Sequence, residues 1–287
     1  MINEKASHYT RLKRLPLGSP FWVCREAMNE FHKKIAQAKQ RLLKLHHDAN
    51  SGHLGGNISC LEALMVLHHN IMKPEDRFIL SKGHAAGALY TTLWSLGKLS
   101  DADLQTFTRD DTTLPGHPSG SSIPGVMFPT GSLGHGPSLA AGLAMATRYT
   151  HKPRHVYCLC SDGEWQEGSC WEALTFAIHH KLDNLTIIID QNGLQGYGRT
   201  KDIISCEDLG PRISSFGAYL QRVDGHAPVA IKQALDERCA GQVSVVILET
   251  TKGRGTYFED TLASHYLPLD DDQFQAAYKA LEQGGSL

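Results

Sequence analysis

The hydrophobic positions of this chain follow two alternating patterns. Between residues 25 and 49 they recur at intervals of three and four, which is typical of one face of a long helix. Short, nearly continuous apolar runs predict buried strands at 77–80, 156–160, 185–189, 218–223 and 243–250. Further helices are expected at 85–96, after Pro137, and at 171–181, 229–240 and 274–282. Because strands and helices alternate, the sequence predicts an α/β fold of three layers, in which a mostly parallel sheet carries helices on both faces.

The chain divides into two parts by composition. Residues 1–20 are basic and lack an apolar period, so we expect a surface arm. Residues 21–287 contain neither a linker nor a repeat, which predicts a single domain near the upper size for one hydrophobic core. Within this part, residues 109–136 are rich in Gly, Pro, Ser and Thr, and a long loop of this kind in a compact domain usually has a function.

Local signals predict where some helices begin. Three glycines within residues 51–56 indicate a loop, or a place where the backbone approaches a ligand. Ser59 and Glu62 have the spacing of a capping box, so a helix is expected to begin at Ser59. Ser100 and Asp103 should begin another short helix.

Polar residues follow two successive predicted strands in the middle of the chain. Asp162 comes two residues after the end of the strand at 156–160, and Asn192 follows the next strand about thirty residues later, which is one βαβ repeat. Ligands bind at this end of the strands in open α/β sheets, and carboxylate and amide oxygens suit Mg²⁺ or Ca²⁺. Gly163 would let a phosphate approach the backbone. On geometry alone, Asp162 could equally cap a helix, and Asn192 with Gly193 could form a turn.

Composition narrows the class of protein. Hydrophobic residues make up 41% of the chain and charged residues 20%, as in ordinary soluble proteins. The net charge of −2 gives no electrostatic reason to expect nucleic acid or an acidic membrane as partner. The apolar runs are too short to span a bilayer, and the N-terminus lacks an apolar signal core. We therefore expect a cytoplasmic protein.

The seven cysteines do not indicate a disulfide framework. Their number is odd and no Cys-x-x-Cys occurs. Cys158 and Cys160 lie in a predicted buried strand, where they should act as small core hydrophobes in a reducing compartment.

Four of the sixteen histidines lie in glycine-rich contexts between the predicted elements: His53, His84, His117 and His265. A single histidine is more often a surface or a hydrogen-bonded structural residue than a functional one. Imidazoles nevertheless titrate near neutral pH, which makes these four the candidates for proton transfer.

The sequences around these residues resemble transketolases. The matching stretches are Asp-Gly-Glu-x-x-Glu-Gly at 162–168, Trp-Glu-Ala at 171–173, Asn-Gly-Leu-Gln at 192–195, Ser-Gly-His-Leu-Gly-Gly at 51–56, Ser-Lys-Gly-His-Ala at 81–85, and Gly-His-Pro at 116–118. The similarity extends from about residue 25 to residue 273. Four positions depart from the family pattern: His135 stands for Gln, Ser161 for Gly, Ser264 for Trp and Tyr266 for Gly.

The resemblance implies a thiamine diphosphate site with a bound Mg²⁺ or Ca²⁺. It places Asp162, Asn192 and the backbone carbonyl of Leu194 at the metal. It places His84, Gly163, Glu164, Lys252 and His265 at or near the diphosphate, and Gly131 and Leu133 at the aminopyrimidine and thiazolium region. His53 and His117 are expected in the substrate channel, so that all four histidines become candidates for catalysis. Glu167 and Glu172 match carboxylates at a subunit interface.

The activity implied is the transfer of a two-carbon ketol unit from a ketose donor, such as a sugar phosphate, to an aldose acceptor. Transketolases need a second, pyrimidine-binding domain, and the few residues after His265 cannot form one. The chain therefore resembles the N-terminal subunit of a split transketolase, working with a separate C-terminal subunit in an α₂β₂ assembly. Two alternatives remain: a catalytically silent cofactor-binding or regulatory subunit, and the α subunit of a 2-oxo acid dehydrogenase.

Overall fold

The structure is a computed structural model that describes residues 21–120, 123–150, 152–205 and 208–282, with side chains from residue 28 onward. The predicted surface arm, residues 1–20, lies outside the described residues, so the division into an arm and one domain stays a prediction. No helix in the described part is long and apolar enough to cross a membrane.

Five parallel strands form the central sheet, in the order β1-β2-β3-β7-β6. Their bounds are Arg77–Leu80, Val156–Ser161, Leu185–Gln191, Ser244–Glu249 and Tyr219–Asp224, given in the order of the sheet. Beyond β3, the short strands β4 (Leu194–Gln195) and β5 (Gly198–Arg199) form a small antiparallel hairpin. The prediction of a mostly parallel sheet is confirmed.

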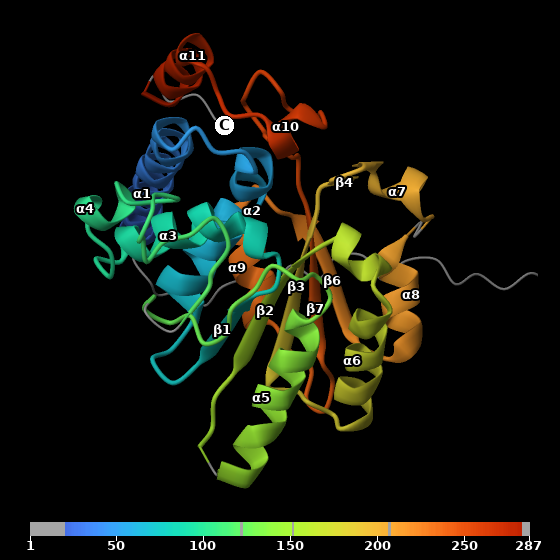
Figure 1. Ribbon diagram of the computed structural model, residues 1–287. Helices are drawn as coiled ribbons and strands as arrows, with labels where there is room; N and C mark the ends of the chain where they lie inside the picture. The colour runs from blue at the N-terminus through green and yellow to red at the C-terminus, as the bar shows by residue number, and fades with distance from the viewer. Residues whose placement is uncertain (1–20, 121–122, 151, 206–207, 283–287) are drawn as a thin grey trace, which may run out of the picture.

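Helices cover both faces of the sheet (Figure 1). One face carries α1 (Phe21–Asp48), α2 (Leu54–Val66), α3 (Ala86–Ser95) and α9 (Pro228–Asp236), with α11 (Asp271–Glu282) packed on α1. The other face carries α5 (Gly136–Thr150), α6 (Gly168–His179) and α8 (Leu209–Phe216). Short helical segments are Leu67–Ile71, Gly83–Ala85, α4 (Asp101–Leu104), Gly163–Gln166, α7 (Thr200–Ile203) and α10 (Ala263–Tyr266).

Alternate residues of the strands supply two separate hydrophobic cores. In β2, Tyr157 and Leu159 pack in the core on the α1–α3 side, whereas Cys158 and Cys160 pack in the core on the α5–α6 side. All four are buried, as expected for a strand covered on both faces. Both thiols are free, which confirms the prediction that they serve as core residues.

The structure corrects the predicted beginning of α2. The helix begins at Leu54, so Gly55 and Gly56 lie in its first turn and not in a loop. Their lack of a side chain serves packing, because a Cβ at Gly55 would come 2.6 Å from Ser264 and a Cβ at Gly56 3.3 Å from the ring of His84. The prediction of a capping box at Ser59 is wrong, since Ser59 lies inside the helix. The capping box of Ser100 and Asp103 is present at the start of α4.

Candidate active site at the carboxyl end of the sheet

The residues that the sequence singled out follow the carboxyl ends of four neighbouring strands, near the top of Figure 1. His84 follows β1, Asp162 follows β2, Asn192 follows β3, and Lys252 follows β7. Because all the strands are parallel, these four positions share one edge of the sheet. The architecture therefore gathers polar groups that are far apart in the sequence.

The four predicted histidines form one cluster centred on His53. The ring centroid of His53 lies 4.7 Å from that of His265, 5.7 Å from that of His84 and 5.7 Å from that of His117. The rings of His84 and His265 are 6.0 Å apart. His117 is exposed, whereas the other three rings are partly buried. His117 belongs to the loop at 109–136 that was expected to have a function, so this loop places one histidine beside the other three.

Backbone contacts hold His53 in place. The residue has the left-handed conformation, with φ of 66°, and its N–H donates to the carbonyl of His265 at 2.9 Å. The buried Asn57 amide donates to the carbonyls of His53 (2.8 Å) and His84 (2.9 Å) and accepts from the N–H of Ala88 (2.7 Å). Sequence reasoning missed Asn57, because a lone asparagine in an apolar helix carries no recognisable signal.

The environment keeps these imidazoles neutral. Burial, followed by the charges of His117 and Lys252, lowers the pKa of His53 to about 4. Burial and then Lys252 lower the pKa of His265 to about 3, and burial lowers the pKa of His84 well below its usual value. Burial also lowers the pKa of His117. Nδ1 of His53 is buried and has no partner among the described residues. A neutral imidazole with a free nitrogen can exchange a proton with a bound molecule.

Lys252 carries a buried positive charge with neutral partners. Its ammonium donates to the carbonyl of Leu194 at 3.2 Å and to Nδ1 of His265 at 2.9 Å. Burial, with the charge of Lys82 second, lowers the pKa of Lys252 to about 8. A bound anion would offset this cost, so Lys252 fits the diphosphate that the resemblance assigns to it.

Asp162 has the environment of a cation ligand. Its carboxylate accepts the N–H groups of Gly163 (2.9 Å) and Gly193 (2.7 Å) and the hydroxyl of Thr200 (3.2 Å). Burial, and then the charge of Asp190, raise the pKa of Asp162 to about 6. A divalent cation would favour the ionised form, and Asp162 therefore fits the predicted metal.

Asn192, which follows β3, and Leu194, which begins β4, flank Gly193, whose N–H donates to this carboxylate. Oδ1 of Asn192 accepts from the N–H of Leu194 at 3.1 Å, and the carbonyl of Leu194 is the oxygen that Lys252 contacts. Both oxygens are hard donors of the kind that Mg²⁺ and Ca²⁺ bind. The described residues contain no group of three or more His, Cys, Asp or Glu side chains that could hold a metal, so any such site depends on an amide and a carbonyl oxygen as well.

Glu164 has fixed partners. Its buried carboxylate accepts the hydroxyl of Ser81, the N–H of Gly134 at 2.8 Å and the N–H of Ser161 at 3.2 Å. These contacts join the ends of β1 and β2 to the loop that precedes α5. A role for Glu164 near the diphosphate stays a prediction.

The remaining predicted positions lie around the cluster. A Cβ on Gly131 would come 3.3 Å from the ring of His117, so this backbone passes close to the histidines. The carbonyl of Leu133 contacts Nδ1 of His135 at 3.1 Å. Glu167 and Glu172 are exposed at the beginning of α6, as a role at a subunit interface would require.

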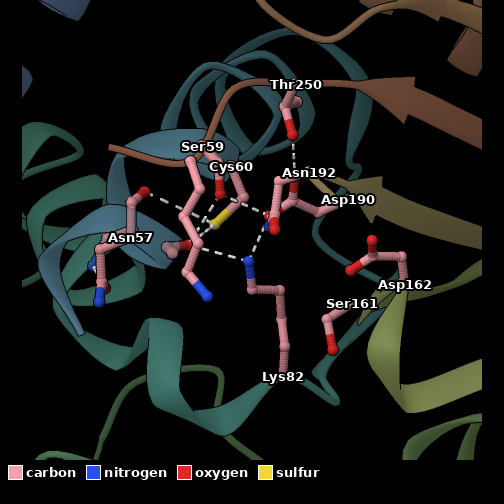
Figure 2. Close-up of polar contacts among 12 residues, drawn as sticks. Asn57, Ser59, Cys60, Lys82, Ser161, Asp162, Asp190, Asn192 and Thr250 are labelled. Carbon is pink, nitrogen blue, oxygen red and sulfur yellow. Dashed lines mark hydrogen bonds and ion pairs between the residues drawn. The ribbon is translucent and has the colours of Figure 1, made fainter. Parts of the chain in front are cut away.

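A buried charge network lies next to the predicted metal ligands Asp162 and Asn192 (Figure 2). The ammonium of Lys82 pairs with the carboxylate of Asp190 and donates to the carbonyl of Gly56 at 2.8 Å. Ser59 donates to the same carboxylate at 2.6 Å, and the Thr250 hydroxyl donates to its other oxygen from the side opposite Lys82. Burial has the largest single effect and opposes the charge of Asp190, but the charge of Lys82 and the hydrogen bonds from Lys82, Ser59 and Thr250 together hold the pKa of this carboxyl below its usual value.

Sequence reasoning missed the Lys82–Asp190 pair. Each residue ends or follows an apolar run, but nothing in the sequence showed that the two charges would meet from different strands. Asp190 also accepts from the side-chain amide of Asn192 at 3.3 Å, which fixes the orientation of that amide. The network therefore helps to hold the predicted metal ligand Asn192 in place.

Comparison with known proteins identifies the family. The family described as "Transketolase, thiamine diphosphate binding domain" matches residues 31–284. The chain belongs to the transketolase family. The resemblance noted in the sequence is thereby confirmed, and the carboxyl-end site lies in a thiamine diphosphate-binding domain.

Two relatives of similar length are named as transketolase subunits. The chain is 38% identical to the 6-deoxy-6-sulfo-D-fructose transketolase subunit of Clostridium sp. (strain MSTE9), over 82% of this chain and 90% of the relative. It is 35% identical to an apulose-4-phosphate transketolase subunit from Actinobacillus succinogenes, over 88% of this chain and 96% of that protein. Human transketolase is 38% identical, but the match covers only 42% of its length.

Solved transketolases share the fold. The enzyme from Leishmania mexicana gives a TM-score of 0.82 at 27% identity, and that from Campylobacter jejuni a TM-score of 0.81 at 30% identity. Each match covers 88% of this chain, but 41% and 43% of the respective transketolase. The chain corresponds to one domain of these longer enzymes. The roles of its individual site residues stay predictions.

Proposed function

We propose that this chain is the N-terminal subunit of a transketolase that moves a two-carbon ketol unit from a ketose donor to an aldose acceptor, together with a separate C-terminal subunit. The proposal rests on how much of each relative's length this chain covers. The chain spans 90% and 96% of two relatives named as transketolase subunits, but 42% of a full-length transketolase. A chain of this extent contributes the diphosphate-binding half of the site, and a partner contributes the pyrimidine-binding half.

The residues at the carboxyl end of the sheet would bind different parts of the cofactor. Thiamine diphosphate, when bound, supplies the electron sink that breaking a carbon–carbon bond beside a carbonyl requires. Lys252, with His84 and His265, would neutralise and orient its diphosphate. Asp162 and Asn192 would hold Mg²⁺ or Ca²⁺ together with the carbonyl of Leu194.

The neutral histidines supply proton transfer. His117 is the exposed member of the cluster, its ring lies 5.7 Å from that of His53, and His53 has a ring nitrogen without a partner among the described residues. A donor sugar must lose a hydroxyl proton as its carbon–carbon bond breaks, and a neutral imidazole can accept that proton. We therefore assign His53 and His117 to proton transfer with the sugar substrate.

Assembly and location follow from the same proposal. The exposed Glu167 and Glu172 and the small residues of α5 support contact between two copies of this chain, giving an α₂β₂ heterotetramer. The cytoplasm is the proposed location. The two related subunits carry the names of different sugars, a sulfosugar and a sugar phosphate, so a test needs a panel of donors.

The test is reconstitution of carbon transfer. The purified chain is supplied with thiamine diphosphate, Mg²⁺, a panel of ketose donors and an aldose acceptor, with and without the candidate C-terminal subunit. We expect activity only in the mixture. Robust activity of the lone chain would refute the split enzyme. A complex that binds the cofactor but transfers no carbon from any donor would favour the silent regulatory subunit. The family match gives no support to a 2-oxo acid dehydrogenase subunit.

A further inference from the structure

Tyr266 joins two segments that border the site. It ends α10, directly after His265, and its ring lies against the ring of His265 with centroids 4.7 Å apart. Its hydroxyl donates to the carbonyl of Gly196 at 2.6 Å. Gly196 lies in the β4–β5 hairpin, two residues after Leu194. Tyr266 therefore connects the segment that follows β7 with the segment that follows β3.

This hydrogen bond completes a closed circuit of contacts. Lys252 donates both to the carbonyl of Leu194 and to Nδ1 of His265. The chain leads from Leu194 to Gly196 on one side and from His265 to Tyr266 on the other, and the Tyr266 hydroxyl closes the circuit. The buried ammonium of Lys252 forms the inner connection and the tyrosine the outer one.

The circuit is tightly packed at Gly196. A Cβ at this position would lie 3.1 Å from the Tyr266 hydroxyl and 3.5 Å from Nε2 of His265. The hairpin thus lies close to both His265 and Tyr266 of α10. A bidentate pair between Arg199 and Asp260, at 3.0 and 2.8 Å, joins the same two segments a second time. That pair is half exposed and contributes little by itself.

We propose that Tyr266 is a positioning residue, which fixes the hairpin against α10 and so holds His265 and Lys252 in the orientation that receives the diphosphate of thiamine diphosphate. This inference rests on the proposed function. Side chains that are already fixed bind more tightly, because less conformational freedom is lost on binding. Tyr266 stands at one of the positions where the sequence departs from the family pattern, and a glycine there could not make this hydrogen bond.

The first test measures thiamine diphosphate binding by calorimetry, in the presence of Mg²⁺, in the complex with the C-terminal subunit. Tyr266→Phe removes the hydroxyl and keeps the ring. We expect it to weaken cofactor affinity by about threefold to tenfold, the usual value of one hydrogen bond. The midpoint of thermal unfolding without cofactor should fall by no more than about 2–4 °C, because Tyr266 is 55% exposed and its hydroxyl makes a single hydrogen bond. The matched control is Tyr257→Phe, at a tyrosine that is 59% exposed and has no hydroxyl partner among the described residues.

A double-mutant cycle tests the circuit itself. Gly196→Ala should weaken cofactor affinity in the wild-type background, since the methyl group crowds the Tyr266 hydroxyl. The same substitution should cost less in the Tyr266→Phe background, where the hydroxyl is gone. Strictly additive effects, or a Tyr266→Phe complex with wild-type affinity, would overturn the inference while leaving the proposed function intact. If the wild-type complex bound no thiamine diphosphate, both would fail.

Discussion

The two ends of the sheet both hold buried histidines, and their surroundings differ. At the amino end, His155 has a partner for each ring nitrogen: Arg238 donates to Nδ1 at 3.0 Å, and Nε2 donates to the hydroxyl of Thr186 at 2.8 Å. Arg238 also donates to the hydroxyl of Tyr157 at 2.6 Å. At the carboxyl end, Nδ1 of His53 has no partner in the described part of the chain.

A lowered pKa does not distinguish the two ends. Burial, with Arg238 second, lowers the pKa of His155 to about 3, the same value as for His265. The two ends differ in whether the ring nitrogens of their histidines already have hydrogen-bond partners. The His155 network is complete without any ligand and serves stability. The carboxyl-end cluster combines a free imidazole nitrogen with a buried ammonium whose partners are neutral, and such groups are suited to receive a ligand.

The largest expected effect is on turnover. His117→Ala should lower kcat/KM for the donor ketose by about 10²- to 10⁴-fold, the usual contribution of a proton-transfer group. Affinity for thiamine diphosphate should change little, because His117 is assigned to the substrate. Steady-state kinetics and calorimetry on the reconstituted complex provide both quantities. Full activity combined with lost cofactor binding would show that the two roles are reversed.

The next effect is on stability at the carboxyl end. Lys82→Met should lower the free energy of unfolding by about 3–5 kcal/mol, because it leaves the Asp190 charge buried and unpaired. Chemical denaturation without cofactor measures this loss. The double variant Lys82→Met with Asp190→Leu should recover part of it, because the buried charge is gone although Ser59 and Thr250 lose their acceptor. If the double variant were as unstable as the single one, the ion pair would not be the cause.

The smallest effect is a pH dependence from the amino end. His155 stays neutral down to about pH 3 in the folded protein, whereas in the unfolded chain it takes up a proton below about pH 6.5. The associated stability is complete above about pH 6.5 and is lost as the pH falls toward 3. His155→Gln should therefore flatten the decline in stability, by up to about 3 kcal/mol at pH 4.

The control for this experiment is His179→Gln, at an exposed histidine on α6. Denaturation at a series of pH values should show the wild-type slope for this control. Equal slopes for His155→Gln and the wild type would contradict the account of the amino end.

The sequence was most informative where a local pattern settles the structure. Apolar runs identified all five strands of the sheet, and parallel order alone brought Asp162 and Asn192 to one edge. The start of α2 was wrong because glycines at a loop and glycines at a close helix contact look alike in sequence. Only the packed structure shows that Ser264 and His84 occupy the space beside Gly55 and Gly56.

Contacts between distant segments could not be predicted. Asn57, Lys82 and Asp190 meet their partners across separate elements, and none lies in a pattern that defines such a partner. In the sequence, Tyr266 is only a departure from the family pattern. In the structure, the tyrosine hydroxyl reaches the carbonyl of Gly196 and gives that position a contact that glycine could not make.

The central claim is that the carboxyl end of the sheet, and not the amino end, binds thiamine diphosphate through a divalent cation. The most direct measurement is calorimetric titration of thiamine diphosphate into the assembled complex, with Mg²⁺ or with EDTA, for the wild type, Asp162→Ala and the amino-end variant Arg238→Met. We predict binding only with Mg²⁺ for the wild type and for Arg238→Met, and no metal-dependent binding for Asp162→Ala. Unchanged affinity in Asp162→Ala would contradict the assignment.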